Sequence, residues 1–246
     1  MATVAELSAL YGNFMRGPRP GPDVCRICFN LTDGYGRCYA CAHGGSWVDA
    51  VGPISYSVAG EQLHHALRSY KLADSPAARR FTIELAAVLW RHLAGHEHCL
   101  AHAAGTPGFE LVTTVPSGDR KRDSEHPLRR LVGELVGPTR ERYRPLLRRT
   151  DAAVEAHEFS IHKFELQHEI APGAAVLLVD DTWTTGANAQ SAAATLKRAG
   201  AGVIAVAVIG RYLNRGWHDN DRRLNGLRAP FDWGRCAHCK LPSNRD

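Results

Sequence analysis

Two adjacent carboxylates lead into a short polar loop in the segment VLLVDDTWTTGAN, residues 176–188. Four apolar residues precede Asp180 and Asp181, as in a buried strand, and open α/β sheets bind ligands at the carboxyl ends of such strands. The loop that follows runs into a predicted helix and comprises Thr184, Thr185, Gly186, Ala187 and Asn188. Its consecutive N–H groups, its hydroxyls and the helix N-terminus predict an anion pocket.

Carboxylates beside an anion pocket suit a ligand that carries both hydroxyl groups and a phosphate. A ribose 5-phosphate has both, because the acids can accept from the sugar hydroxyls while the loop holds the phosphate. The competing interpretation is a buried strand that ends in a capping acid pair before an ordinary helix. Trp183 either packs under the sugar site or fills core space. Paired acids followed by T-T-G at this spacing favour the sugar-phosphate interpretation.

Six of the seven cysteines form C-x-x-C pairs. The first two pairs, Cys25 with Cys28 and Cys38 with Cys41, are separated by nine residues. Four thiolates suit the tetrahedral coordination that zinc prefers, and the metal would supply folding energy to a module too short for its own core. We therefore predict a structural zinc site, the alternative being redox-active or uncoordinated thiols.

The third pair, Cys236 and Cys239, needs further ligands to hold a metal. It either completes a second site with His43 or His218, replaces one of the N-terminal pairs, or lies in a disordered tail. The three interpretations remain open from the sequence.

Helical spacing of apolar residues predicts a helix that begins at Ser75, a capping residue followed by a proline that fits the first turn. Gly95 is the predicted end of this helix. The residues beyond it include potential metal ligands, namely His96, His98, Cys99 and His102. Because they follow a glycine, we interpret the cluster as exposed polar residues of a loop, and Cys99 by itself as a small, partly buried residue.

Strand and helix patterns alternate along most of the chain. A short extended segment is predicted at 52–60, and buried strands are predicted in FELVTTV, in AAVLLVDD and in GVIAVAVIG, with helices between them. This alternation predicts an α/β fold, a mostly parallel sheet flanked by helices on both faces. The chain divides into a cysteine-rich zinc-binding module over 1–50, an α/β domain over 51–215, and a basic tail with a C-x-x-C pair over 216–246.

Composition narrows the class of protein. Of the 246 residues, 44% are hydrophobic and 22% charged, an ordinary globular balance. No apolar run is long enough to span a membrane, and the N-terminus lacks a secretory signal, so we expect a cytoplasmic protein with no membrane partner.

The net charge of the chain is +5. Ten basic and five acidic residues lie between Asp119 and Arg149, a local field that suits a phosphorylated ligand or a nucleic-acid backbone, or that simply marks a solvated face.

Residues 176–188 resemble the motif with which type I phosphoribosyltransferases bind 5-phosphoribosyl 1-diphosphate (PRPP). The order of other features resembles the ComF family, the competence-associated branch of that group. These features are the paired C-x-x-C module from Cys25 to Cys41, the SYKL sequence at 69–72, and a strand that ends in Val115-Pro116. The resemblance runs from about Cys25 to Gly210 and implies the type I phosphoribosyltransferase-like fold.

The resemblance also implies a second part of the site. In such proteins the turn after the V-P strand holds pyrophosphate through backbone N–H groups, and here the turn comprises Pro116, Ser117, Gly118, Asp119 and Arg120. The alternative is a plain strand-to-helix turn. The implied reaction transfers phosphoribose from PRPP to an unidentified small-molecule acceptor with release of pyrophosphate. Asp180 and Asp181 would be the catalytic pair that holds the ribose, Mg²⁺ would bridge it to the pyrophosphate, and the basic segment with Arg148 and Arg149 would close over the site.

The chain departs from the family after the V-P strand and in the basic loop, where LLRRTDAAVEAHEF lacks the glutamine that is usual in the family. The R-G-x-N-Q sequence that usually follows the V-P strand is absent, since the chain reads RKRDSEHPLRRL there. Thr184 stands where purine-salvage enzymes carry an acid, which argues against hypoxanthine or guanine as the acceptor. The alternative function is a nucleic-acid-binding accessory protein of DNA uptake or recombination, with PRPP as a regulator or not bound.

Overall fold

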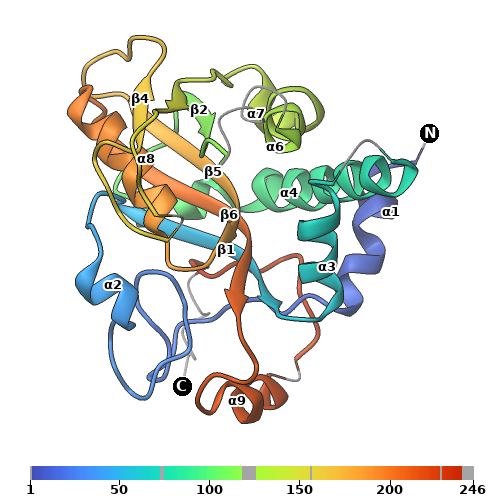
Figure 1. Ribbon diagram of the computed structural model, residues 1–246. Coiled ribbons are helices and arrows are strands. Elements are labelled where there is room, and N and C mark those ends of the chain that lie inside the picture. The colour runs from blue at the N-terminus through green and yellow to red at the C-terminus, as the bar shows by residue number, and fades with distance from the viewer. Residues whose placement is uncertain (1, 73–74, 118–125, 156, 228, 240–246) are drawn as a thin grey trace, which may run out of the picture.

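The computed structural model describes residues 2–72, 75–117, 126–155, 157–227 and 229–239. At its centre lies a four-stranded sheet in which each neighbouring pair of strands is parallel (Figure 1). The strands lie side by side in the order β1 (Ala50–Val58), β6 (Val203–Leu213), β5 (Ala175–Trp183) and β2 (Leu111–Thr114). Parallel neighbours need crossover connections, and helices supply them here. The predicted α/β class, with a mostly parallel sheet flanked by helices, is confirmed.

The central strands are apolar on both faces because both faces are covered. In β5, Leu177 and Val179 belong to one core, whereas Val176 and Leu178 belong to the other. This alternation follows from the two-residue period of a strand. A strand buried on both faces reads as a continuous apolar run.

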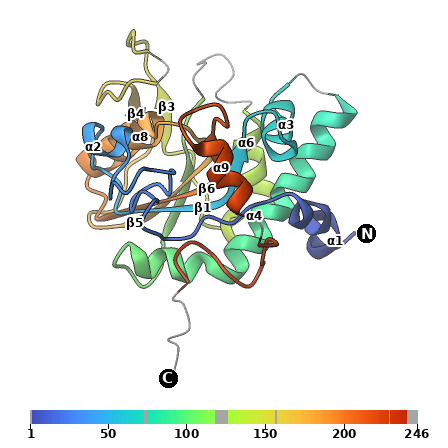
Figure 2. The ribbon, with the colours of Figure 1, turned by 90° about the horizontal axis from the view of Figure 1, so that it is seen from below.

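Helices cover the first face, and Figure 2 shows the longest of them, α4, lying along the sheet. The elements packed into this core are α1 (Val4–Ala9), η1 (Leu10–Asn13), α3 (Gln62–Ser69), α4 (Pro76–Ala103), α6 (Pro127–Arg130), η2 (Leu131–Leu135) and α7 (Gly137–Arg140).

The second face carries a helix, a hairpin and the cysteine-rich segment. These are α8 (Ala187–Arg198), the antiparallel pair β3 (Leu147–Arg149) and β4 (Phe164–Leu166), and the loops around α2 (Tyr39–His43). The remaining helix, α9 (Asn220–Gly226), packs against the carboxyl ends of β1 and β6. The sheet is therefore the middle of three layers, and its carboxyl edge is left for the site.

Helix α4 begins as predicted but extends further. The Ser75 hydroxyl accepts a hydrogen bond from the Ala78 N–H (3.1 Å), and Pro76 occupies the first turn. The predicted end at Gly95 is wrong, because the helix continues to Ala103. A glycine inside a helix costs only about 1 kcal/mol, and the burial of Leu100 beyond it offsets that cost.

The first fifty residues do not pack as one unit. Tyr11 and Met15 lie in the core under α4, whereas the four N-terminal cysteines lie in the core on the opposite face of the sheet. The proposed boundaries at residues 50 and 215 fall at the start of β1 and just after β6 and remain predictions. In the described part of the chain, no helix combines the length and the apolar character needed to cross a membrane.

Candidate functional site

A pocket of about 720 Å³ opens at the carboxyl ends of the parallel strands. Both predicted carboxylates line it, together with two residues of the predicted anion loop, Thr184 and Asn188. Pro116 and Ser117, which follow β2, line it from the neighbouring strand. The structure therefore brings the two predicted loops to one pocket, because the strands that carry them are paired in parallel. Gly118, Asp119 and Arg120 lie outside the described residues.

The carboxylate pair is held from the opposite wall by residues that follow α3. The Tyr70 hydroxyl donates a hydrogen bond to Asp181 Oδ2, and Lys71 Nζ lies 2.6 Å from the same oxygen. Tyr70 and Asp181 are buried, at 1% and 3% exposure. Asp180 instead accepts from the Asp181 N–H (2.9 Å) and lines the pocket. Both acids line the pocket, but Asp181 is fixed by two side chains, whereas Asp180 is held by a backbone N–H.

These environments separate the acidities of the two groups. Burial, and then the neighbouring charge of Asp181, raises the pKa of Asp180 to about 7. Burial acts on Asp181 as well, but the Lys71 ammonium and the Tyr70 hydroxyl outweigh it and hold the pKa of Asp181 below its usual value. Near neutral pH, Asp181 is therefore ionised and Asp180 is poised between its two forms.

The anion loop turns through a glycine in the left-handed region. Gly186 has φ of +84°, and a Cβ built on it would lie 2.2 Å from the Trp183 ring. Trp183 is 1% exposed, and its indole N–H has no hydrogen-bond partner among the described residues. Trp183 therefore both fills core space and forms the floor beneath the loop. Glycine is required here by the backbone angle and by the ring together.

A buried lysine braces the far end of the anion loop. Lys163 is 1% exposed, and its ammonium donates to Asn188 Oδ1 (3.0 Å) and to the carbonyls of Glu155 (3.0 Å) and Glu158 (2.8 Å). Burial, and then the charge of Arg149, lowers the pKa of Lys163. The segment between β3 and β4 is thereby fastened to the first turn of α8.

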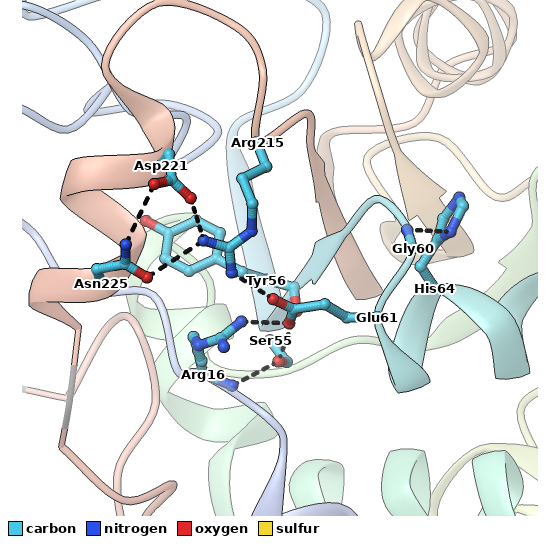
Figure 3. A network of polar contacts seen from close by, with 9 residues as sticks. All are labelled: Arg16, Ser55, Tyr56, Gly60, Glu61, His64, Arg215, Asp221 and Asn225. Carbon is cyan, nitrogen blue, oxygen red and sulfur yellow. Dashed lines mark hydrogen bonds and ion pairs between the residues drawn. The ribbon is translucent and has the colours of Figure 1, made fainter.

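An ion-pair network supports the rim of the pocket beside His64, which lines it (Figure 3). Glu61 pairs with Arg16 and, at 2.6 Å, with Arg215. Arg215 also pairs with Asp221 on α9. Burial opposes ionisation of Glu61, but its two arginine partners prevail and lower its pKa. The network ties the N-terminal segment, the turn after β1 and α9 together next to the pocket.

The four N-terminal cysteines meet as predicted. Cys25, Cys28, Cys38 and Cys41 are all buried, and their sulfurs lie within 4.8 Å of one another. The Cys28 and Cys38 sulfurs are 3.6 Å apart. These distances and four thiolates can hold a structural metal such as zinc.

A buried arginine connects this cluster with the candidate pocket. Arg211 on β6 donates from Nε to the Cys28 carbonyl (3.0 Å) and from Nη1 to the Trp183 carbonyl (3.0 Å). Its Nη2 lies 3.6 Å from the Cys28 sulfur. The positive charge therefore sits between the thiols and the floor of the anion loop.

A second group that can hold a structural metal lies on the other side of the sheet. It comprises His96 and Cys99 from α4 with Cys236 and Cys239 from the C-terminal segment, again within 4.8 Å. The structure thus gives the third C-x-x-C pair partners that differ from those the sequence suggested. The interpretation of the residues after Gly95 as a loop is wrong, because they belong to α4. His96 is buried, whereas His98 and His102 are exposed as expected.

No protein family model matches the sequence, and no curated protein matches it either.

Sequence reasoning missed the residues that brace the site. Tyr70 and Lys71 lie in the SYKL stretch, whose apolar spacing showed only a helix, and Lys163 lies in a stretch that reads as polar loop. A lysine that is buried in the structure carries no local signature of burial in the sequence. His126, which lines the pocket beside the Tyr70 ring, likewise had no signal.

Proposed function

We propose that this chain is a type I phosphoribosyltransferase-like protein that binds PRPP with Mg²⁺ and transfers its phosphoribose to a small-molecule acceptor. The observation that carries the proposal is the meeting of Asp180, Asp181, Thr184 and Asn188 in one pocket at the carboxyl edge of a parallel sheet. Acids alone would suit a cation, and the loop alone an anion. A sugar phosphate needs both.

The proposed roles follow from the positions of the groups. Asp180, which faces the pocket, accepts hydrogen bonds from the ribose hydroxyls, with Asp181 beside it. The loop from Thr184 to Asn188 holds the 5′-phosphate against its N–H groups, aided by the N-terminus of α8. The turn that begins at Pro116 and Ser117 receives the pyrophosphate, with the Lys71 ammonium on the facing wall.

The proposed reaction is a substitution at C1 of the ribose. The C1–O bond to pyrophosphate breaks as the bond from the acceptor to C1 forms, and pyrophosphate departs with the bonding electrons. The acceptor loses its proton to solvent or to a basic group of the pocket. When bound, Mg²⁺ would neutralise pyrophosphate charge through oxygen ligands, and the oxygens of Asp180 are of the hard type that it prefers.

Calorimetric titration with PRPP and Mg²⁺ tests the proposal. Asp180→Asn removes a charged acceptor of the kind that contributes about 1.5–3 kcal/mol per hydrogen bond, so affinity should fall at least about tenfold. Asp219→Asn is the matched control, an identical change at an exposed acid that pairs with Arg222 on the surface, and it should bind as the parent does.

A parallel titration with single-stranded DNA separates the alternative function. Strongly salt-dependent DNA binding by a parent protein that shows no PRPP affinity would overturn the proposal. If PRPP binds, mass spectrometry of a metabolite extract incubated with PRPP and the protein identifies the acceptor as a product that is heavier by one phosphoribosyl group.

A further inference from the structure

Helix α4 and the C-terminal segment each present a pair of metal-binding side chains at one point. His96 and Cys99 are three residues apart in α4, a spacing that places them on the same side of the helix. Cys236 and Cys239 approach that side from a segment 137 residues and more further along the chain. Each pair alone offers two ligands, and together they offer the four that a closed zinc site uses.

The distances between the ligand atoms match a tetrahedral site. The Cys239 sulfur lies 3.4 Å from the Cys236 sulfur, 3.8 Å from the Cys99 sulfur and 3.6 Å from His96 Nδ1. Zinc with Zn–S of about 2.3 Å and Zn–N of about 2.0 Å holds its ligands about 3.5–3.8 Å apart.

The hydrogen bond of His96 selects the nitrogen that faces the cluster. Its Nε2 lies 2.8 Å from the Trp233 carbonyl oxygen, which only accepts, so Nε2 must carry the proton. Nδ1 is then left with a free lone pair, and it is the atom that points to Cys239. A histidine ligand whose other nitrogen donates to a carbonyl is the usual arrangement around a protein-bound metal.

Backbone N–H groups point at the sulfurs. Cys236 N–H lies 3.2 Å from the Cys239 sulfur, and His238 N–H lies 3.3 Å from the Cys236 sulfur. Such donors stabilise thiolates, the form that binds metal. Cys236 and His96 are buried, at 8% and 6% exposure.

We propose that His96, Cys99, Cys236 and Cys239 bind a second zinc ion, which fastens the C-terminal segment to α4. The site is structural, because four protein ligands leave no open coordination position. It is independent of the proposed PRPP pocket, to which none of the four residues contributes.

The fastened C-terminal segment lies beside β1, which is the outermost strand of the sheet. Beside it, His238 Nε2 lies 2.9 Å from the Val51 carbonyl, and the cavity left between this segment, α4 and β1 is only about 10 Å³. An uncovered edge strand is a template for association with other chains. The second zinc therefore holds the cover of the sheet edge in place.

Metal content of the full-length chain, purified without chelators and under reducing conditions, tests the proposal. The parent should contain two zinc ions per chain by elemental analysis. Cys239→Ser and Cys28→Ser should each contain one, and the double variant none. His102→Ala is the matched control, because His102 is an exposed histidine of the same helix that is not among the four ligands, and this variant should keep two zinc ions.

Two outcomes would overturn the proposal. One is a parent with a single zinc ion that Cys28→Ser removes. The other is a Cys239→Ser protein that keeps the parent's full zinc content.

Hydrogen exchange gives an independent readout of how the C-terminal segment is held. In Cys239→Ser, amides of β1 should exchange faster than in the parent, whereas those of β5 should not. Thiol titration of the unfolded parent without reductant excludes a Cys236–Cys239 disulfide if it counts all seven cysteines.

Discussion

Adjacent side chains of one type have different chemistry at this site. Asp180 and Asp181 follow each other in β5, so their side chains point to opposite sides of the strand. Asp181 meets Tyr70 and Lys71, whereas Asp180 meets a backbone N–H and the pocket. One acid is consequently held ionised, and the other is left to respond to ligand and to pH.

The affinity for PRPP should therefore rise with pH across the neutral range. A ribose hydroxyl donates best to an ionised carboxylate, and the pKa of Asp180 is raised to about 7. Parallel titrations at pH 6 and pH 8 should show an increase that Asp180→Asn reduces. The phosphates of the ligand titrate alike in both proteins, so only the difference between the two slopes reports on Asp180. Equal slopes would contradict the assignment.

Without ligand, pH has the opposite effect on this group: Asp180 contributes less to the stability of the folded protein as the pH rises. A carboxyl whose pKa is raised from 3.8 stabilises the folded state below that value and loses the contribution as pH rises through about 7. Relative to Asp180→Asn, the parent should lose on the order of 1 kcal/mol or more of unfolding free energy between pH 4 and pH 8 in urea denaturation.

The cost of replacing Gly186 has two parts, one from the backbone angle and one from packing against Trp183. Gly186→Ala should cost about 1 kcal/mol for its positive φ, and a further 1–3 kcal/mol, roughly, for forcing a methyl group against the buried Trp183 ring. Gly105→Ala is the control, because Gly105 has a similar φ of +78° and open space where the methyl group would lie. Urea denaturation of both variants should show the larger loss at Gly186, and equal losses would argue against the contact with Trp183.

At the scale of elements, the site depends on a segment without regular structure. The chain between β3 and β4 is attached to α8 by the buried Lys163 ammonium group, which bonds to Asn188 and to two carbonyls, and by the Ser160 N–H, which donates to Ser191 Oγ (3.0 Å). These bonds hold the segment against the first turns of α8. Arg148 of β3 makes no such contribution, since it is half exposed and pairs with Glu165 on the neighbouring strand.

Lys163→Met should therefore destabilise the fold and release that segment. Three partly buried acceptors would lose a charged donor, and a hydrogen bond to a charged group contributes about 1.5–3 kcal/mol. Arg148→Met on the same hairpin is the control and should cost less than about 1 kcal/mol, as exposed ion pairs do. Denaturation and hydrogen exchange measure the two effects. A Lys163→Met protein as stable as Arg148→Met would show that the ammonium contacts contribute little.

At the scale of the whole molecule, Arg211 connects the cysteine cluster on one face to the anion loop at the edge of the sheet. It contacts both the Cys28 sulfur and the Trp183 carbonyl. Four thiolates around zinc carry a net negative charge, which the guanidinium offsets. The cysteine cluster and the pocket are thus connected through one buried arginine.

Loss of the N-terminal metal should consequently weaken ligand binding from a distance. Cys28→Ser is expected to lower both the thermal midpoint and the PRPP affinity, the latter several-fold. Cys239→Ser also removes a thiol from a cysteine cluster, but one that has no contact with Arg211, so its affinity should stay at the parent value. Calorimetry on the two folded variants measures the difference, and equal affinities would separate the cluster from the pocket.

Patterns among residues that are close in the sequence predicted much of the fold and part of the candidate site. The apolar run before Asp180, the alternation of strands and helices, and the spacing of the first two cysteine pairs depend on residues near one another in the chain. The cap at Ser75 is equally local. These features predict the parallel sheet, one cysteine cluster and the acids that line the pocket from the sequence alone.

Only the tertiary structure decided which distant residues meet. The contacts of Asp181 with Tyr70 and Lys71, of Lys163 with Asn188, and of α4 with the last C-x-x-C pair each depend on how the elements pack. Burial in particular is a property of the packed molecule, because a lysine or histidine reads as exposed until other elements cover it. Helix α4 shows the same physics, since packing carried it past the glycine at which its local sequence predicted an end, and so brought His96 and Cys99 into reach of the C-terminal cysteines.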